Sequence, residues 1–169
     1  DANFTGFNPP ADVTEAFADD AGLTSNFRVD GTAGSVLRNV LAGQTITFQA
    51  TNDITVNAGA PFNLNTATGV SNVSLVLQAR NNVNLNSVVT ATGTGTVSVS
   101  ADDDASGAGN IVIAAAGGIV TANQAINLKA VTLNITAGAT INSGSGNITI
   151  TPSAVSTVGL GAGAGTMSI

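Results

Sequence analysis

The chain has 169 residues and a net charge of −6, with 43% of its residues hydrophobic, 8% charged and 4% aromatic, and it contains no Cys, His, Trp or Tyr. This length fits one domain, but without histidine bases, thiols and phenols the usual nucleophilic, proton-transfer and soft-metal sites cannot be built. Only four residues are basic, so the clustered positive charge that nucleic acids and anionic membranes require is also missing. We therefore predict a protein that is not an enzyme, has no cofactor and no nucleic-acid partner, and does not span a membrane.

Residues 1–42 form the acidic, Phe-containing part of the chain, since six of the ten acidic residues lie within the first 30 positions. Asp12 and Glu15 follow two prolines in an arrangement that resembles a helix capping box, which predicts one short helix near residues 12–20. Two interpretations stay open, a surface helix on a linker and a segment that covers one end of the β domain. We expect this segment to act as a cap or a docking element.

From residue 43 onward the chain is rich in Thr, Asn and Gly, nearly uncharged, and repetitive. Residues 47–57 (TFQATNDITVN) align with residues 76–86 (VLQARNNVNLN) at an offset of 29 (76 − 47). Residues 106–113 (SGAGNIVI) match residues 143–150 (SGSGNITI) at an offset of 37 (143 − 106). Both pairs predict short strands that begin or end at a polar corner.

The apolar alternation predicts several further strands at irregular spacing. A repeat of 20 to 50 residues made of two or three short strands is typical of a solenoid, because one such unit cannot bury its apolar face alone. Stacking at about 4.8 Å places Ile and Val in inward columns. We predict an all-β chain with a β-solenoid over residues 43–169, and leave open whether about 36 residues make one turn or more. The expected strands start near Ile46, Leu75, Val97, Ile111, Leu133 and Ile148.

The strings TITFQATNDITVNAG (45–59), VLQARNNVNLN (76–86), SGAGNIVIAAAGGIV (106–120) and SGSGNITITPSAV (143–155) resemble the degenerate repeats of filamentous-haemagglutinin-type bacterial exoproteins. The resemblance is one of composition and rhythm and covers about residues 43–158. It implies a right-handed parallel β-helix, export from the bacterial cell, and a role as an adhesin, filament or surface layer. It supplies no catalytic motif and does not extend to residues 1–42.

Asp102, Asp103 and Asp104 form the densest charge cluster. Carboxylates on a loop could hold Ca²⁺, which prefers oxygen ligands, but the spacing fits neither an EF-hand nor a calcium-binding β-roll. A solvated corner loop is the favoured interpretation. Cleavage of polysaccharide by paired carboxylates is the least favoured alternative, because few acids, bases and aromatic residues lie in the repeat region.

Thr pairs such as Thr45/Thr47 and Thr149/Thr151 suggest a flat ice-binding face, although Thr is also a good former of any exposed strand. The pairs do not recur at one fixed spacing, so we favour ordinary exposed strand faces.

The two ends of the chain are the candidate self-assembly interface. The sequence ends in GLGAGAGTMSI without a charged or proline-bearing cap, and an uncapped solenoid exposes unpaired backbone that recruits another chain. A head-to-tail contact of this kind generates an open fibre, whereas truncation of a longer solenoid explains the same ending equally well. The candidate residues are Phe4, Phe7, Phe17, Thr166, Met167 and Ile169.

We expect an extracellular or cell-surface protein, secreted by a bacterium, that is a subunit or segment of a fibre. The absence of Cys suits export, and the first residue, Asp1, fits either removal of a signal peptide or a piece of a longer protein. The alternative is an adhesin module that binds a glycan or a cell-surface protein through loops such as 87–96 or 101–109.

Overall fold

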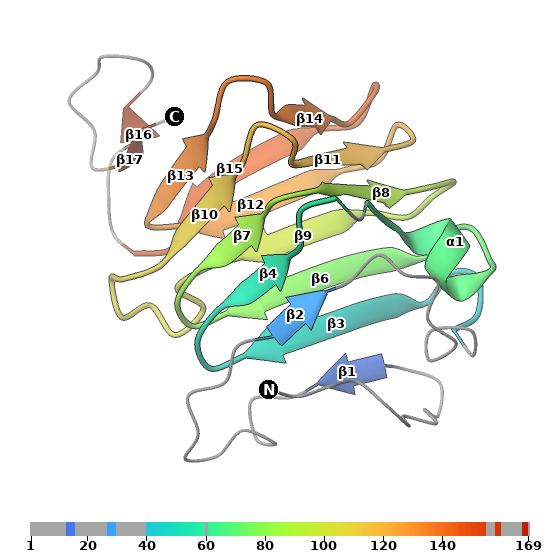
Figure 1. Cartoon of the computed structure of the whole chain (residues 1–169), viewed down its shortest axis with the longest axis horizontal. Coiled ribbons are helices and arrows are strands. Elements are labelled where there is room, and N and C mark those ends of the chain that lie inside the picture. The colour runs from blue at the N-terminus through green and yellow to red at the C-terminus, as the bar shows by residue number, and fades with distance from the viewer. Residues whose placement is uncertain are drawn as a thin grey trace.

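The fold is described by a computed structural model that places residues 40–59 and 61–154, together with four short strands outside these ranges. They are β1 (Val13–Glu15), β2 (Phe27–Val29), β16 (Val158–Gly159) and β17 (Met167–Ser168). The described chain is nearly all β, as predicted, and three parallel sheets make up most of it (Figure 1).

The three sheets, here called A, B and C, contain strands that are neighbours in space but not in sequence. Sheet A contains β1, β3 (Thr45–Ala50), β6 (Ser74–Ala79), β9 (Val97–Ser100), β12 (Ile126–Ala130) and β15 (Ile148–Pro152). Sheet B contains β2, β4 (Ile54–Val56), β7 (Val83–Leu85), β10 (Asn110–Ile113) and β13 (Thr132–Ile135). Sheet C contains β5 (Phe62–Asn63), β8 (Val88–Ala91), β11 (Gly118–Thr121) and β14 (Thr140–Asn142).

From β3 onward the chain visits sheets A, B and C in turn and then returns to sheet A beside the strand it left. We call each such visit a circuit. Circuits 1 to 4 cover residues 45–73, 74–95, 96–124 and 125–146, and β15 belongs to a fifth. Equivalent residues lie 29, 22, 29 and 22 positions apart along the chain. In Figure 1 the strands of each sheet follow one another from β1 and β2 at one end to β14 and β15 at the other.

The core consists of columns of apolar side chains that point inward from the three sheets. Alternate residues of a strand face opposite sides, and the parallel register places like residues above one another. In sheet A, Phe48 pairs with Leu77, Leu77 with Val99, and Val99 with Leu128. All four are at most 3% exposed. Burial of each such side chain stabilises the fold by about 1.5–3 kcal/mol, which makes the columns the main source of stability.

Polar ladders follow the same register at the corner between sheets A and B. The Nε2 atom of Gln49 donates to Oε1 of Gln78 at 2.6 Å. The Oδ1 atom of Asp53 accepts from the backbone N–H of Asn82 at 2.9 Å and from its Nδ2 at 3.1 Å. The Oδ1 atom of Asn82 in turn accepts from the backbone N–H of Asn110 at 3.0 Å. These bonds satisfy polar groups at positions where the chain leaves the ladder of sheet A.

At the corner between sheets C and A, an asparagine with a positive φ angle accepts a backbone hydrogen bond from the next circuit, and this arrangement occurs twice. Asn72 and Asn123 have positive φ angles of 66° and 64°. The Oδ1 atom of Asn72 accepts from the backbone N–H of Thr94 at 3.0 Å, and that of Asn123 accepts from the N–H of Ser145 at 2.9 Å. A Cβ atom at Gly93 would lie 1.9 Å from Oδ1 of Asn72. Glycine is therefore required above this asparagine.

The long circuits differ from the short ones by insertions at two different corners. Circuit 1 carries α1 (Leu64–Thr68) between β5 and β6, with Asn63 as its N-cap and Gly69 at its end. Circuit 3 carries residues 101–109 between β9 and β10, where circuit 4 has Val131 alone between β12 and β13. The insertions leave the strand register intact, so the shared unit is the shorter circuit with its three strands.

The structure confirms one predicted offset and corrects the other. The offset of 29 is the true register of β3 with β6 and of β4 with β7. The offset of 37 is wrong as a structural repeat. Ile111 pairs with Val83 and Leu133 in sheet B, whereas Ile148 pairs with Ile126 in sheet A. The two SGxGN strings resemble each other because both precede a strand, not because they occupy the same place in successive circuits.

The predicted helix near residues 12–20 is wrong at residues 13–15, which form β1. β1 pairs in parallel with β3, with Val13 beside Ile46. A capping box is a local signal of modest energy, and the backbone hydrogen bonds of a ladder outweigh it. β2 likewise pairs with β4. The segment for which we expected a capping or docking role thus adds one strand to each of sheets A and B.

Candidate functional site

The loop at residues 101–109 brings the three consecutive aspartates to the corner between sheets A and B. Its organising residue is Asp102, which has a φ of 56° and is fully buried. The Oδ1 atom of Asp102 accepts from Oγ of Ser106 at 2.9 Å and from the N–H of Gly107 at 2.9 Å and of Ala108 at 3.3 Å. Its Oδ2 atom accepts from Oγ of Ser153 at 2.6 Å. The carboxylate therefore holds the loop closed and ties it to the residue after β15.

The hydrogen bonds set the protonation state of Asp102. Burial alone would raise the pKa of this carboxyl group, but the bonds from Ser153, Ser106, Gly107 and Ala108 favour the charged form and leave the pKa below its ordinary value. Both oxygens of this carboxylate are thus engaged by donors of its own loop and of Ser153. The expectation of a fully solvated loop is thus wrong for Asp102, while Asp103 is half-buried and Asp104 is exposed.

The aspartates do not converge on a common centre. Oδ1 of Asp103 accepts from Oγ of Ser100 at 3.0 Å, and Oδ1 of Asp104 faces the N–H of Ser106 at 3.4 Å. Within residues 40–59 and 61–154 no three acidic side chains come together in a way that could hold a metal ion. The calcium interpretation therefore gains no support from the geometry of this loop.

The outward face of sheet A carries mostly polar side chains in rows that run across the strands. The register aligns Gln49, Gln78, Ser100, Lys129 and Thr151 in one row. The neighbouring row contains Thr47, Val76, Ser98, Asn127 and Thr149. The register places Thr14 of β1 beside Thr47, and the other threonines of these rows, Thr149 and Thr151, lie on β15. Other residue types occupy β6, β9 and β12 in these two rows, which are therefore not the regular Thr rows of an ice-binding face.

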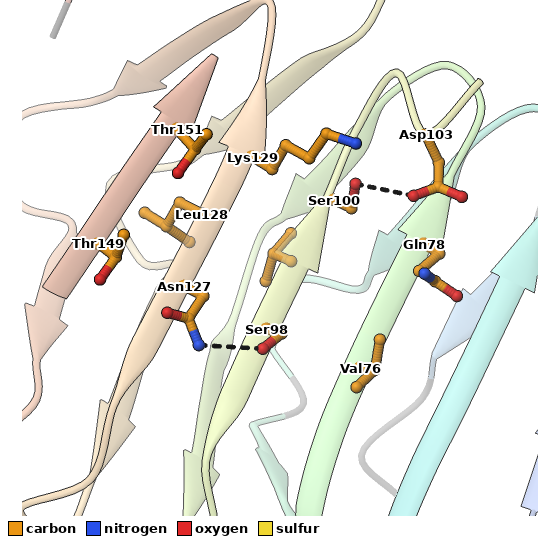
Figure 2. A pocket seen from close by; sticks show the side chains of 11 residues that line it. Val76, Gln78, Ser98, Ser100, Asp103, Asn127, Leu128, Lys129, Thr149 and Thr151 are labelled. Atoms are coloured by element: carbon orange, nitrogen blue, oxygen red, sulfur yellow. Dashed lines mark hydrogen bonds between the residues drawn. The ribbon is translucent and has the colours of Figure 1, made fainter. Parts of the chain in front are cut away.

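A shallow groove of about 350 Å³ lies over β6, β9, β12 and β15 on this face. Figure 2 shows its floor and the loop at its edge, with Lys129 extending toward the side where Asp103 lies. Nδ2 of Asn127 donates to Oγ of Ser98 at 3.3 Å. The groove is lined by Val76, Gln78, Ser98, Val99, Ser100, Asp103, Asn127, Leu128, Lys129, Thr149 and Thr151. The run of aspartates makes the loop visible in the sequence. The groove floor is not visible there, because the outward positions that meet across the strands can be identified only once the register is known.

The inward columns are exposed where they reach β13 and β15. Ile148 is 45% exposed and Ile135 is 37% exposed, although their partners one circuit earlier, Ile126 and Ile113, are fully buried. At this end the apolar columns reach the surface.

The candidate self-assembly residues lie largely outside the described part of the chain. Phe4, Phe7, Phe17, Thr166 and Ile169 are in this group, and their role stays a prediction. Met167 belongs to β17, which pairs in parallel with β16 through Val158.

The described residues contain one helix, α1, which covers Leu64–Thr68. No helix in this part of the chain has the length and hydropathy needed to cross a bilayer. Comparison with known proteins found no matching family model, no matching curated protein and no matching solved structure.

Proposed function

We propose that this chain is a right-handed parallel β-helix that acts as a building element of an extracellular or cell-surface fibre and stacks end to end. Three parallel sheets visited in fixed order support the β-helix. Connections between parallel strands of one sheet are right-handed in about 98% of cases, which supports the handedness. The resemblance of residues 43–158 to filamentous-haemagglutinin-type repeats supports the fibre role and secretion from a bacterium.

The observation that carries the proposal is the exposure of Ile148 at a column position that is buried in circuit 4. Full burial of an aliphatic side chain of this size contributes about 1.5–3 kcal/mol. Ile148 and Ile135 are 45% and 37% exposed, so covering them with a further strand layer recovers part of that energy. Among the strands that the structure describes, β15 is also the outermost of sheet A. Unpaired edges of this kind accept another chain. Pro152 lacks a donor, so pairing would rely on the segment from Ile148 to Thr151.

The chemistry of the described chain is compatible with a structural role. Its one buried carboxylate, on Asp102, is fully engaged in holding a loop, and its side chains otherwise form columns and ladders. A head-to-tail contact between one end of the stack and the other does not close on itself, and it therefore produces an open fibre.

Electron microscopy and analytical ultracentrifugation of the full chain over a range of concentrations test this proposal. We expect particles that lengthen with concentration. Ile148→Lys places a charge inside the proposed interface and should shorten the fibres or abolish them. Thr149→Lys is the matched control, because it adds the same charge on the outward face of the same strand. Monodisperse particles at every concentration, or equal effects of the two variants, would contradict the proposal.

A further inference from the structure

We infer that the groove on the outer face of sheet A binds a linear, neutral polysaccharide laid across the strands, along the direction in which the circuits stack. This inference goes beyond the structural role and does not depend on it, because the groove lies within one chain. It rests on the composition of the groove, on the hydrogen-bonding groups left unused there, and on the spacing of the rows.

The side chains of the groove suit a hydroxyl-bearing ligand better than a nucleic acid. Val76 is the single apolar side chain on its outward rows, and the other outward side chains carry hydroxyl, amide, carboxylate or amine groups that can hydrogen-bond to a sugar. The groove also contains one amine, on Lys129, and one carboxylate, on Asp103. A nucleic acid requires clustered positive charge, and balanced charges favour a ligand without net charge.

Polar atoms of the groove remain available for a ligand. Within the described part of the chain, Nζ of Lys129 forms no hydrogen bond or ion pair, and Asp103 uses only Oδ1, on Ser100. Lys129 can therefore donate to a sugar oxygen while Oδ2 of Asp103 accepts from a sugar hydroxyl group. A hydroxyl group both donates and accepts, so a sugar can satisfy both residues, whereas a purely anionic or cationic ligand satisfies only one.

The groove is arranged for a long ligand rather than a single sugar. Its floor crosses four strands, β6, β9, β12 and β15, and parallel strands repeat about every 4.8 Å. Successive circuits therefore present mostly polar side chains at a constant spacing to an extended chain. Ser, Thr and Asn on a rigid sheet lose little conformational freedom on binding, which lowers the cost of ordering the site.

Calorimetric titration of the full chain with cellohexaose, xylohexaose and mannohexaose tests the inference, with the matching disaccharides and the anionic hexaguluronate as comparisons. We expect saturable binding of at least one neutral hexasaccharide and at least tenfold weaker binding of its disaccharide, because the shorter ligand reaches fewer circuits. Asn127→Ala and Lys129→Ala should each weaken binding about 3- to 10-fold, as expected for the loss of one hydrogen bond.

Asn134→Ala is the matched control for Asn127→Ala, because Asn134 is an exposed asparagine on β13 in sheet B. It should leave the affinity unchanged, and circular dichroism should show that all variants are folded. Three results would each overturn the inference: no binding of any neutral hexasaccharide, equal loss of binding in the sheet A and sheet B variants, or preferential binding of hexaguluronate that depends on Lys129. A chain that binds a hexasaccharide without forming fibres would refute only the fibre proposal.

Discussion

The Oγ atom of Ser153 lies 2.6 Å from Oδ2 of Asp102, a residue that is 51 positions earlier in the chain. Asp102 belongs to circuit 3 and Ser153 follows the first strand of circuit 5, so this bond passes over the corner of circuit 4. That corner is the shortest of its kind, with Val131 alone between β12 and β13. The inserted loop of circuit 3 therefore reaches a residue that the regular strand pairing would keep two circuits away.

Replacing this carboxylate should destabilise the fold. Asp102→Asn keeps the size of the side chain but removes the charge and turns one acceptor into a donor that faces other donors. Hydrogen bonds to charged groups contribute about 1.5–3 kcal/mol each, and we expect Asn to retain some of them, so the loss in free energy of unfolding should be about 1–3 kcal/mol. Urea unfolding at neutral pH measures it. Asp104→Asn, on the exposed aspartate of the same loop, is the control and should change stability little.

The effect of Asp102 should also depend on pH. Its pKa in the folded protein is lowered from the ordinary value of 3.8. A lowered folded-state pKa means that the stabilisation is complete above the unfolded-state value and is lost as the pH falls through the folded-state value. The difference in unfolding free energy between the wild type and Asp102→Asn should thus be constant near neutral pH and should shrink below about pH 4. A difference that grows on acidification would contradict this assignment.

Another prediction concerns the contact between Gly93 and Asn72. Gly93 has a φ of 64°, and a Cβ atom there would lie 1.9 Å from Oδ1 of Asn72. Gly93→Ala should cost more than the about 1–2 kcal/mol of a left-handed alanine, because Asn72 must also give up its bond to Thr94, which is worth about 1 kcal/mol. Gly59→Ala supplies the control, since Gly59 has a φ of 79° and nothing within 4 Å of the added atom.

Thermal unfolding of the two glycine variants separates backbone strain from the contact. We expect the midpoint of thermal unfolding to be lower for Gly93→Ala than for Gly59→Ala. If both variants lose the same amount, the asparagine contact contributes nothing beyond the conformation of the turn.

A further prediction concerns the apolar column of sheet A. Leu77 is fully buried between Phe48 and Val99, and Leu77→Ala should cost about 2–5 kcal/mol through lost burial and the cavity left behind. Val76→Ala, one position earlier and on the outward face, should cost about 1 kcal/mol or less. Denaturant unfolding of both variants tests the assignment of faces, and a larger loss for Val76→Ala would reverse it.

The strands and the polar corner between sheets A and B were the part of the fold that could be predicted from the sequence. The polar corner ending in Asn52 and Asp53 recurs at Asn81 and Asn82, and the structure confirms that these are the same corner in successive circuits. The shorter repeat was not recognised, because α1 and residues 101–109 lengthen alternate circuits at different corners. Without the register, an insertion and a repeat unit cannot be distinguished in the sequence.

The remaining errors have a common cause in long-range contacts. The capping pattern at Asp12 and Glu15 is a local signal, and it was overridden by pairing of β1 with β3, about 30 residues downstream (46 − 13 = 33). Burial of Asp102 depends on Ser153, and no sequence motif connects these two residues. The helix α1 is the exception, since its N-cap Asn63 and the Gly69 at its end are local signals that the sequence itself contains.

The bond between Asp102 and Ser153 also has a mechanical consequence. Force applied along the stacking direction would load the backbone hydrogen bonds one strand at a time, so circuits would peel from the end that exposes Ile148. The bond joins circuit 3 to circuit 5, which are not neighbours in the stack. Circuit 5 therefore cannot separate from circuit 4 unless this bond also breaks, and the last circuits resist the force together. If the chain serves in a fibre under tension, this bond adds a side-chain link between circuits 3 and 5 to the backbone ladder that joins β12 and β15.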